Sequence, residues 1–179
     1  MSFELLQSEV LLKGRAFTIR RDTLKTPDER VTKFDIIEHH GSVVIIPVDK
    51  EGNLLLVRQY RHATRGELLE LPAGTLEDSQ EDPQHCAARE IREETGFAAG
   101  KLTRLGEFYL APGYSTEFMV VFLATDLHHD PLEADADEFL SLVSMPLQDV
   151  IRKAEAGEIP DAKSLAALFL ARPHLEAKA

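Results

Sequence analysis

The sequence predicts an α/β protein in which a mixed sheet packs between helices. Three observations support this class: short β-type runs fill the first half of the chain, a helix with clear start and stop signals follows, and two more helical segments lie near the C-terminus. Predicted strands outnumber predicted helices, and the helices lie between and after the strands. At 179 residues with 44% apolar side chains, the chain is long enough for a core that needs no disulfide.

The N-terminal segment has the pattern of a small antiparallel sheet. Residues 17–20 alternate apolar and polar side chains, as a half-buried strand does. Residues 26–29 have the composition of a turn, and residues 31–38 form the next predicted strand. We therefore expect residues 1–40 to form a sheet of their own and residues 41–179 to form the main domain.

Two apolar runs, residues 42–49 and 53–61, flank a Lys50-Glu51-Gly52 segment that has the composition of a hairpin loop. Both runs are nearly continuous, which predicts strands covered on both faces. The remaining elements are expected as three strands and two helices: strands at residues 102–110, 118–126 and 139–144, and helices at residues 147–154 and 161–171.

The helix predicted for residues 82–95 has the clearest boundaries. Asp82 can accept hydrogen bonds from the first helical amides, and Pro83 suits the first helical position. Gly96 can end the helix in a left-handed conformation.

Charge and cysteine content narrow the class of protein. Lys and Arg total 20 and Asp and Glu total 31, so the formal charge is −11. This balance argues against a protein that coats nucleic acid or a membrane, because affinity for phosphate backbones comes from clustered cations. The single cysteine, Cys86, can form neither an intramolecular disulfide nor a Cys-rich zinc site. With no secretory signal and no apolar run long enough for a bilayer, we expect a cytoplasmic protein.

Three carboxylates share one face of the predicted helix. Glu90 and Glu94 are four residues apart, and Glu93 lies beside them. Two carboxylates about 5 Å apart repel by roughly 3 kcal/mol at an effective dielectric constant near 20, and a divalent cation reverses the sign of that interaction. Oxygen ligands without clustered His or Cys favour Mg²⁺ or Mn²⁺ over zinc. The alternative is a solvated acidic helix face.

The segment Gly74 to Phe97, GTLEDSQEDPQHCAAREIREETGF, resembles the Nudix box. That pattern is a Gly, five residues, a Glu, seven residues, and then Arg-Glu-aliphatic-x-Glu-Glu-x-Gly-aliphatic. Seven residues separate Glu81 from Arg89, and residues 89–97 supply the rest of the pattern. The chain departs from it in one place, since six residues rather than five separate Gly74 from Glu81. The insertion falls in a loop and alters loop shape more than helix register.

The resemblance implies a Nudix-type α/β/α sandwich that hydrolyses a nucleoside diphosphate linked to another moiety. It implies a metal shell of main-chain and side-chain oxygens: the Ala73 carbonyl and the carboxylates of Glu90, Glu93 and Glu94. Arg89 resembles the orienting arginine of the family, paired with a carboxylate such as Glu70 or Glu81. Bound Mg²⁺, or Mn²⁺, would neutralise the diphosphate, activate water and stabilise the leaving phosphate.

Residues outside the box resemble those of ADP-ribose and nucleoside diphosphate sugar pyrophosphatases. The segments that carry this resemblance are LELPAG at residues 69–74 and APGYSTE at residues 111–117, with Pro112 sixteen positions beyond Gly96. Arg58 and Arg61 lie near the end of a predicted strand, where a guanidinium can grip a diphosphate by paired hydrogen bonds. The resemblance favours Arg61 as the phosphate contact and implies that Glu117 contacts the distal ribose. The alternatives are strand-end charges for the arginines and a plain turn at Pro112.

Water attack needs a base outside the metal shell. The acidic segment LEADADEF, residues 132–139, precedes a predicted strand where the subfamily keeps a mobile catalytic glutamate. We expect Glu138 to be the base, beside Glu93 as the other catalytic carboxylate; the rivals are Glu133, Asp135 and Asp137. The alternative is a solvated acidic loop.

The N-terminal strands also resemble the swapped sheet through which these pyrophosphatases form homodimers. Phe17 is a candidate to stack on the base of a substrate bound by the partner, with a packed core Phe as the alternative. The leading expectation is therefore a homodimeric hydrolase of ADP-ribose-like diphosphates. Two alternatives stay open: a hydrolase of nucleoside triphosphates or dinucleoside polyphosphates, and a ligand-sensing module without catalysis, which typically loses box glutamates.

Overall fold

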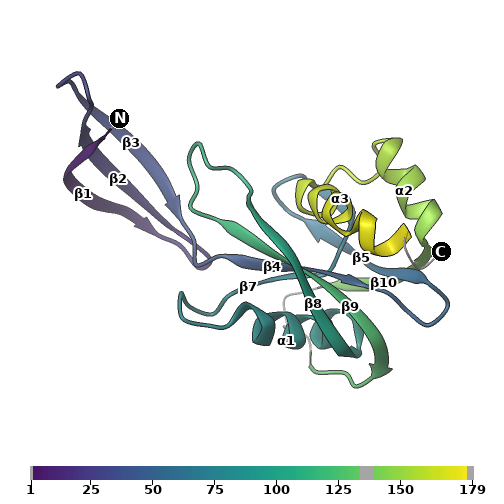
Figure 1. Ribbon diagram of the computed structural model, residues 1–179. Helices are drawn as coiled ribbons and strands as arrows, with labels where there is room; N and C mark the ends of the chain where they lie inside the picture. Colours follow the sequence, from purple (N-terminus) through teal and green to yellow (C-terminus); the bar gives the residue numbers. More distant parts are fainter. Residues whose placement is uncertain (1, 134–138, 177–179) are drawn as a thin grey trace.

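One strand, β4 (Ser42–Pro47), organises the body of the protein because helices cover it on both faces. The computed structural model describes residues 2–133 and 139–176 (Figure 1). All six residues of β4 are buried. Val43 and Ile45 pack against helix α1 (Pro83–Thr95), whereas Val44 and Ile46 pack against helix α3 (Ala162–Glu176). This confirms the predicted strand with two covered faces.

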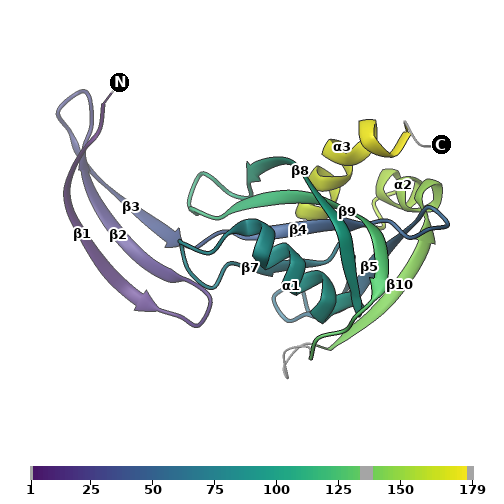
Figure 2. The ribbon, with the colours of Figure 1, turned by 60° about the horizontal axis from the view of Figure 1, so that its bottom comes forward.

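The central sheet is mixed. Its strands lie in the order β7-β4-β9-β8, with β7 at Ala73–Thr75, β9 at Phe118–His129 and β8 at Phe97–Tyr109. Strands β4 and β9 are parallel, and the other neighbours are antiparallel. Helices α1 and α3 lie on opposite sides of this sheet in both views (Figures 1 and 2). The observed architecture is therefore the predicted α/β/α sandwich.

A second, antiparallel sheet has the order β10-β5-β6, with β10 at Leu140–Pro146, β5 at Asn53–Arg61 and β6 at Gly66–Glu70. Helix α2 (Leu147–Glu155) follows β10 directly. The predicted hairpin loop at residues 50–52 is confirmed, since the Asp49 N–H bonds the Asn53 carbonyl and Val48 pairs with Leu54. Beyond this bridge β4 and β5 separate and do not form a ladder with each other. Both edges of each strand are taken by other partners: β7 and β9 flank β4, and β6 and β10 flank β5.

The N-terminal sheet projects from the body (Figures 1 and 2). Its strands are β1 (Glu4–Lys13), β2 (Thr18–Lys25) and β3 (Val31–Glu38), all antiparallel. The backbone of Ile37 joins this sheet to the body through hydrogen bonds with Tyr114 and Thr116. Exposed apolar side chains cover this part of the chain: Phe3, Leu5, Leu6, Val10, Leu11, Leu12, Phe17, Val31 and Phe34.

The predicted ends of α1 are confirmed. The Asp82 side chain accepts a hydrogen bond from the Gln84 N–H, and Gly96 adopts a left-handed φ of 78°. Helix α3 is longer than expected and continues through Pro173 to Glu176. Within residues 2–133 and 139–176, no helix has the length and apolarity needed to cross a bilayer.

Candidate functional site

The carboxylate face of α1 packs against β7. Glu90 and Glu94 are each only 8% exposed. Gly74 of β7 backs directly onto Glu90, since a Cβ added to Gly74 would lie 1.8 Å from Glu90 Cδ. The next contact along the strand is a hydrogen bond from the Ala73 N–H to Glu94 Oε2, at 3.1 Å. The helix and strand thus meet where only a glycine fits.

Arg89 lies among the carboxylates. Its Nη1 is 2.7 Å from Glu90 Oε1 and 2.8 Å from Glu93 Oε2, and its Nη2 is 3.9 Å from Glu81 Oε1. Burial acts to lower the pKa of Arg89, but the charges of Glu90 and Glu93 outweigh it and raise that pKa. Arg89 is therefore a fixed cation that holds the carboxylates of the box in place.

The donor set at this junction fits a hard divalent cation. Ala73, Glu90, Glu93 and Glu94 offer only oxygen ligands, and Gly74 leaves room for the Glu90 carboxylate beside β7. Within the described residues, no three His, Cys, Asp or Glu side chains converge as a ready cluster. Glu90 and Glu93 instead point at Arg89, so a bound cation would compete with the guanidinium for these oxygens.

Glu70 has other partners than the resemblance suggested. It is 1% exposed and accepts two hydrogen bonds from Arg61, from Nε at 2.9 Å and from Nη2 at 2.7 Å. Lys163 of α3 also bonds it. The expected pairing of Arg89 with Glu70 is thus not seen, and Glu81 is the alternative that lies near Arg89.

The charge of Glu70 is stabilised by this pairing. Burial acts to raise the pKa of Glu70, but the hydrogen bonds and charges of Arg61 and Lys163 outweigh it and hold the pKa below 4.5. The Arg61 pKa is raised, chiefly by its bonds to Glu70, with a further contribution from the charge of Glu94. The charge of Glu94 on α1 therefore acts on the Arg61 guanidinium.

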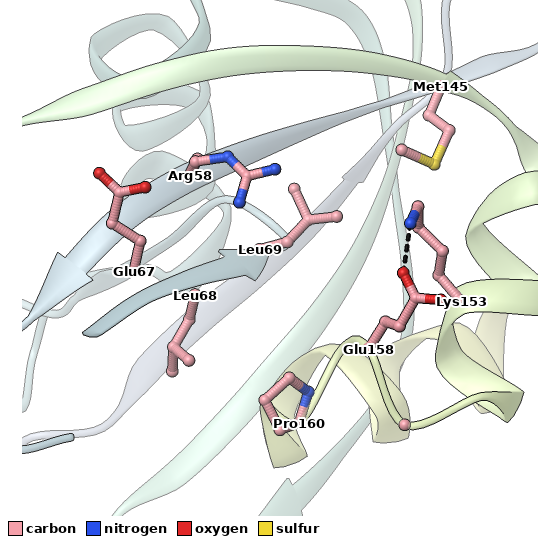
Figure 3. A pocket seen from close by; sticks show the side chains of 9 residues that line it. Arg58, Glu67, Leu68, Leu69, Met145, Lys153, Glu158 and Pro160 are labelled. Atoms are coloured by element: carbon pink, nitrogen blue, oxygen red, sulfur yellow. Dashed lines mark hydrogen bonds and ion pairs between the residues drawn. The ribbon is translucent and has the colours of Figure 1, made fainter. Parts of the chain in front are cut away.

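The structure separates Arg58 from Arg61. The two residues are three apart on a regular strand, so their side chains lie on opposite faces of β5. Arg58 is exposed and lines a hollow of about 270 Å³ beside α2 (Figure 3). Other side chains around this hollow are Glu67, Leu68, Leu69, Met145, Lys153, Glu158 and Pro160.

The other expected contacts are spread around the body. Glu117 Oε1 accepts a hydrogen bond from Ser42 Oγ at 3.2 Å, at the start of β4. Pro112 is exposed in a turn, and Phe17 is 40% exposed at the start of β2. Glu138, the expected base, lies outside the described residues, as do Asp135 and Asp137, whereas Glu133 is described and exposed.

Sequence reasoning missed the first turn of α3. Lys163 bonds Glu70 and Ser164 bonds Leu71, each across 93 positions of the chain, and Asp161 bonds both Lys163 and Ser164. A predicted helix start at residue 161 was the only local signal, and it could not indicate which strand the turn would contact.

Comparison with known proteins gives consistent matches. A family model described as "NUDIX domain" matches residues 38–168. The chain is 34% identical to an ADP-ribose pyrophosphatase of Bacillus subtilis (strain 168) over 165 residues, 91% of this chain and 89% of that protein. It is 37% identical to an ADP-ribose pyrophosphatase of Mycobacterium tuberculosis over 175 residues, 93% and 82% of the two chains. The crystal structure of an ADP compounds hydrolase is similar, with a TM-score of 0.87, 28% identity, and coverage of 100% of this chain and 97% of that one.

The Glu70 pairing predicts a pH-dependent contribution to stability. Because the folded chain lowers the pKa of Glu70, its charged form stabilises the fold above about pH 4.5, and this stabilisation is lost as the pH falls through the lowered value. We expect Glu70→Gln to reduce the free energy of unfolding by about 3 kcal/mol at pH 7, as when a buried pair is broken, and by much less near pH 3.

Urea unfolding of wild type and Glu70→Gln at both pH values measures this difference. Glu107→Gln, which removes an exposed ion pair with Arg104, is the matched control and should change little at either pH. A Glu70→Gln difference that stays constant from pH 7 to about pH 3 would contradict the assignment.

Proposed function

The chain belongs to the Nudix family, and from this premise we propose that it hydrolyses the diphosphate bond of ADP-ribose or a related nucleoside diphosphate sugar. The products are a nucleoside monophosphate and a sugar phosphate. The observation that carries the proposal is the junction of α1 and β7, where Gly74 makes room for Glu90 and the Ala73 N–H binds Glu94. The intact set of box glutamates argues against a sensing module.

Nudix hydrolases depend on divalent metals, and we propose Mg²⁺ as the ion, with Mn²⁺ as a substitute. Its ligands would be oxygens of the box: the Ala73 carbonyl and the carboxylates of Glu90, Glu93 and Glu94. When bound, the ion would neutralise the diphosphate charge and lower the pKa of a water molecule. Arg89 holds the Glu90 and Glu93 carboxylates in place through ion pairs.

We propose further substrate contacts for residues around the junction. Arg61, whose side chain is 39% exposed despite its two bonds to Glu70, can still donate to a diphosphate oxygen. Glu117 is proposed for the distal ribose, and Pro112 lies in the exposed turn that precedes it. Arg58 faces the other side of β5, so we assign it no contact with a substrate bound at α1.

A substrate panel tests the function. We expect wild type with Mg²⁺ to cleave ADP-ribose and other nucleoside diphosphate sugars and to leave ATP and diadenosine polyphosphates largely intact, with products identified by mass. Glu94→Gln removes a proposed ligand charge and should reduce kcat/KM by about a hundredfold or more, whereas Glu107→Gln should match wild type.

The other outcomes have distinct meanings. Cleavage of triphosphates or dinucleoside polyphosphates alone would assign the chain to a different Nudix substrate class. Binding of a nucleotide without turnover of any compound would favour the sensing module.

The catalytic base is proposed as Glu138. Glu138→Gln keeps the size of the side chain but cannot accept the proton of the attacking water. We expect kcat to fall by about a thousandfold with KM within about threefold of wild type, measured by steady-state kinetics on ADP-ribose. Asp135→Asn and Asp137→Asn are the controls. Near-normal turnover of Glu138→Gln, with loss in one of the other two variants, would transfer the role.

We propose that the N-terminal sheet of residues 1–40 pairs with a second copy of the chain, while residues 41–179 form the catalytic domain. The apolar side chains of this three-stranded sheet are exposed, and a large exposed apolar surface marks an interface. In such a dimer we propose that Phe17 stacks on the base of a substrate held by the partner.

Light scattering tests the dimer. The expected molar mass is twice the 20.0 kDa of one chain. Leu12→Asp, which adds a charge to the exposed face of β1, should shift the mass toward the monomer, and Phe169→Asp, on the exposed side of α3, should not. A monomeric wild type at micromolar concentration would overturn both the dimer and the shared site.

A further inference from the structure

The segment that runs from the end of β6 to the first residue of β7 has side-chain partners at both ends. Its residues 71–73 include Pro72, which has no N–H, so the segment has only two amide donors. The Ala73 N–H donates to Glu94 on α1, and the Leu71 N–H donates to Ser164 Oγ on α3, at 2.7 Å. The two helices that cover opposite faces of the sheet therefore each hold one end of the same short segment.

The direction of the hydrogen bond between Leu71 and Ser164 is fixed by a second bond of the Ser164 hydroxyl. Ser164 is fully buried, and its hydroxyl donates to Asp161 Oδ2 at 2.6 Å. The same Asp161 oxygen accepts the Ser164 N–H at 3.1 Å, which caps the first turn of α3. Because the hydroxyl proton points to Asp161, the Ser164 oxygen is left to accept the Leu71 N–H.

Lys163, the residue before Ser164, contacts the side chain of Glu70 rather than the main chain of residues 71–73. Lys163 Nζ lies 2.8 Å from Asp161 Oδ2 and also bonds Glu70, which in turn holds Arg61. Two cations and two anions alternate along this chain of contacts, and Lys163 and Glu70 are both buried. The position of Arg61 therefore depends on α3 as well as on its own strand.

We propose that the first turn of α3, formed by Asp161, Lys163 and Ser164, is a positioning element of the diphosphate site. Ser164 sets the main chain of residues 71–73, and so the Ala73 carbonyl that the proposed metal shell uses. Lys163 sets the Glu70 carboxylate, and so Arg61. The catalytic consequence rests on the proposed function and the effect on metal binding rests on the proposed metal shell, whereas the effect on the main chain rests on neither.

Ser164→Ala tests whether Ser164 positions the main chain of residues 71–73, with Mn²⁺ as the probe. In metal-free protein we expect amide hydrogen exchange to be about tenfold faster at Leu71 and also at Ala73, whose own acceptor is untouched. Electron paramagnetic resonance should show Mn²⁺ affinity about tenfold weaker, the usual effect of losing an outer-shell partner. Ser141→Ala, at an exposed position on β10, is the matched control and should leave all these values unchanged.

Lys163→Met tests whether Lys163 positions Arg61 through Glu70. It should raise KM for ADP-ribose about tenfold through Arg61 while Mn²⁺ affinity stays at the wild-type value. Lys153→Met, which removes a lysine of the exposed ion pair on α2, is its control. Should Ser164→Ala fail to fold, Asp161→Asn weakens the acceptor of the Ser164 hydroxyl and is expected to give the same changes at smaller size.

The outcomes separate this inference from the function itself. Faster exchange at Leu71 alone, with Ala73 exchange and Mn²⁺ affinity unchanged, would make Ser164 a structural residue. It would overturn the proposal that Ser164 positions the Ala73 carbonyl. An unchanged KM in Lys163→Met would overturn the proposal that Lys163 positions Arg61 through Glu70. If wild type binds Mn²⁺ but cleaves no nucleotide sugar, the proposed function fails, while exchange and Mn²⁺ binding still decide the role of Ser164.

Discussion

The rest of the site depends on the close approach of α1 to β7. Carboxylates are rarely buried unless hydrogen bonds and counter-charges offset the loss of water. Here the helix brings Glu90 and Glu94 to the strand, where the missing Cβ of Gly74 leaves space for one and the Ala73 N–H binds the other. A larger residue at position 74 would push the helix away and separate the proposed side-chain ligands from the Ala73 carbonyl.

Strand β4 makes that approach possible from both sides. Its alternating side chains belong to two separate hydrophobic clusters, one beneath α1 and one beneath α3. Because both helices are fixed on the same strand, their ends can reach the same neighbouring segment, residues 70–73. The Pro72 carbonyl accepts a hydrogen bond from the Ile45 N–H of β4 at 2.8 Å, which connects that segment to the strand between the helices.

Local patterns were enough to predict much of this molecule. The bounds of β3 and β5, the cap at Asp82 and the stop at Gly96 follow from periodicity and single-residue preferences, and the ridge of glutamates follows from spacing on one helix. The partners of Glu70 could not be predicted in this way, since Lys163 comes from a distant helix. The separation of Arg58 from Arg61, in contrast, was already implied by strand periodicity.

The distribution of charge suggests that the proposed cation would serve substrate binding as well as hydrolysis. The chain carries a formal charge of −11, and the carboxylates of Glu90, Glu93 and Glu94 concentrate part of that negative charge on one helix. Both arginines at the junction already bond carboxylates, Arg61 with Glu70 and Arg89 with Glu90 and Glu93. A diphosphate within the Debye length of about 8 Å therefore meets net repulsion from the protein alone. Divalent ions bound at the proposed ligands Glu90, Glu93 and Glu94 would reverse that repulsion, so we expect metal affinity and substrate affinity to be coupled in this protein.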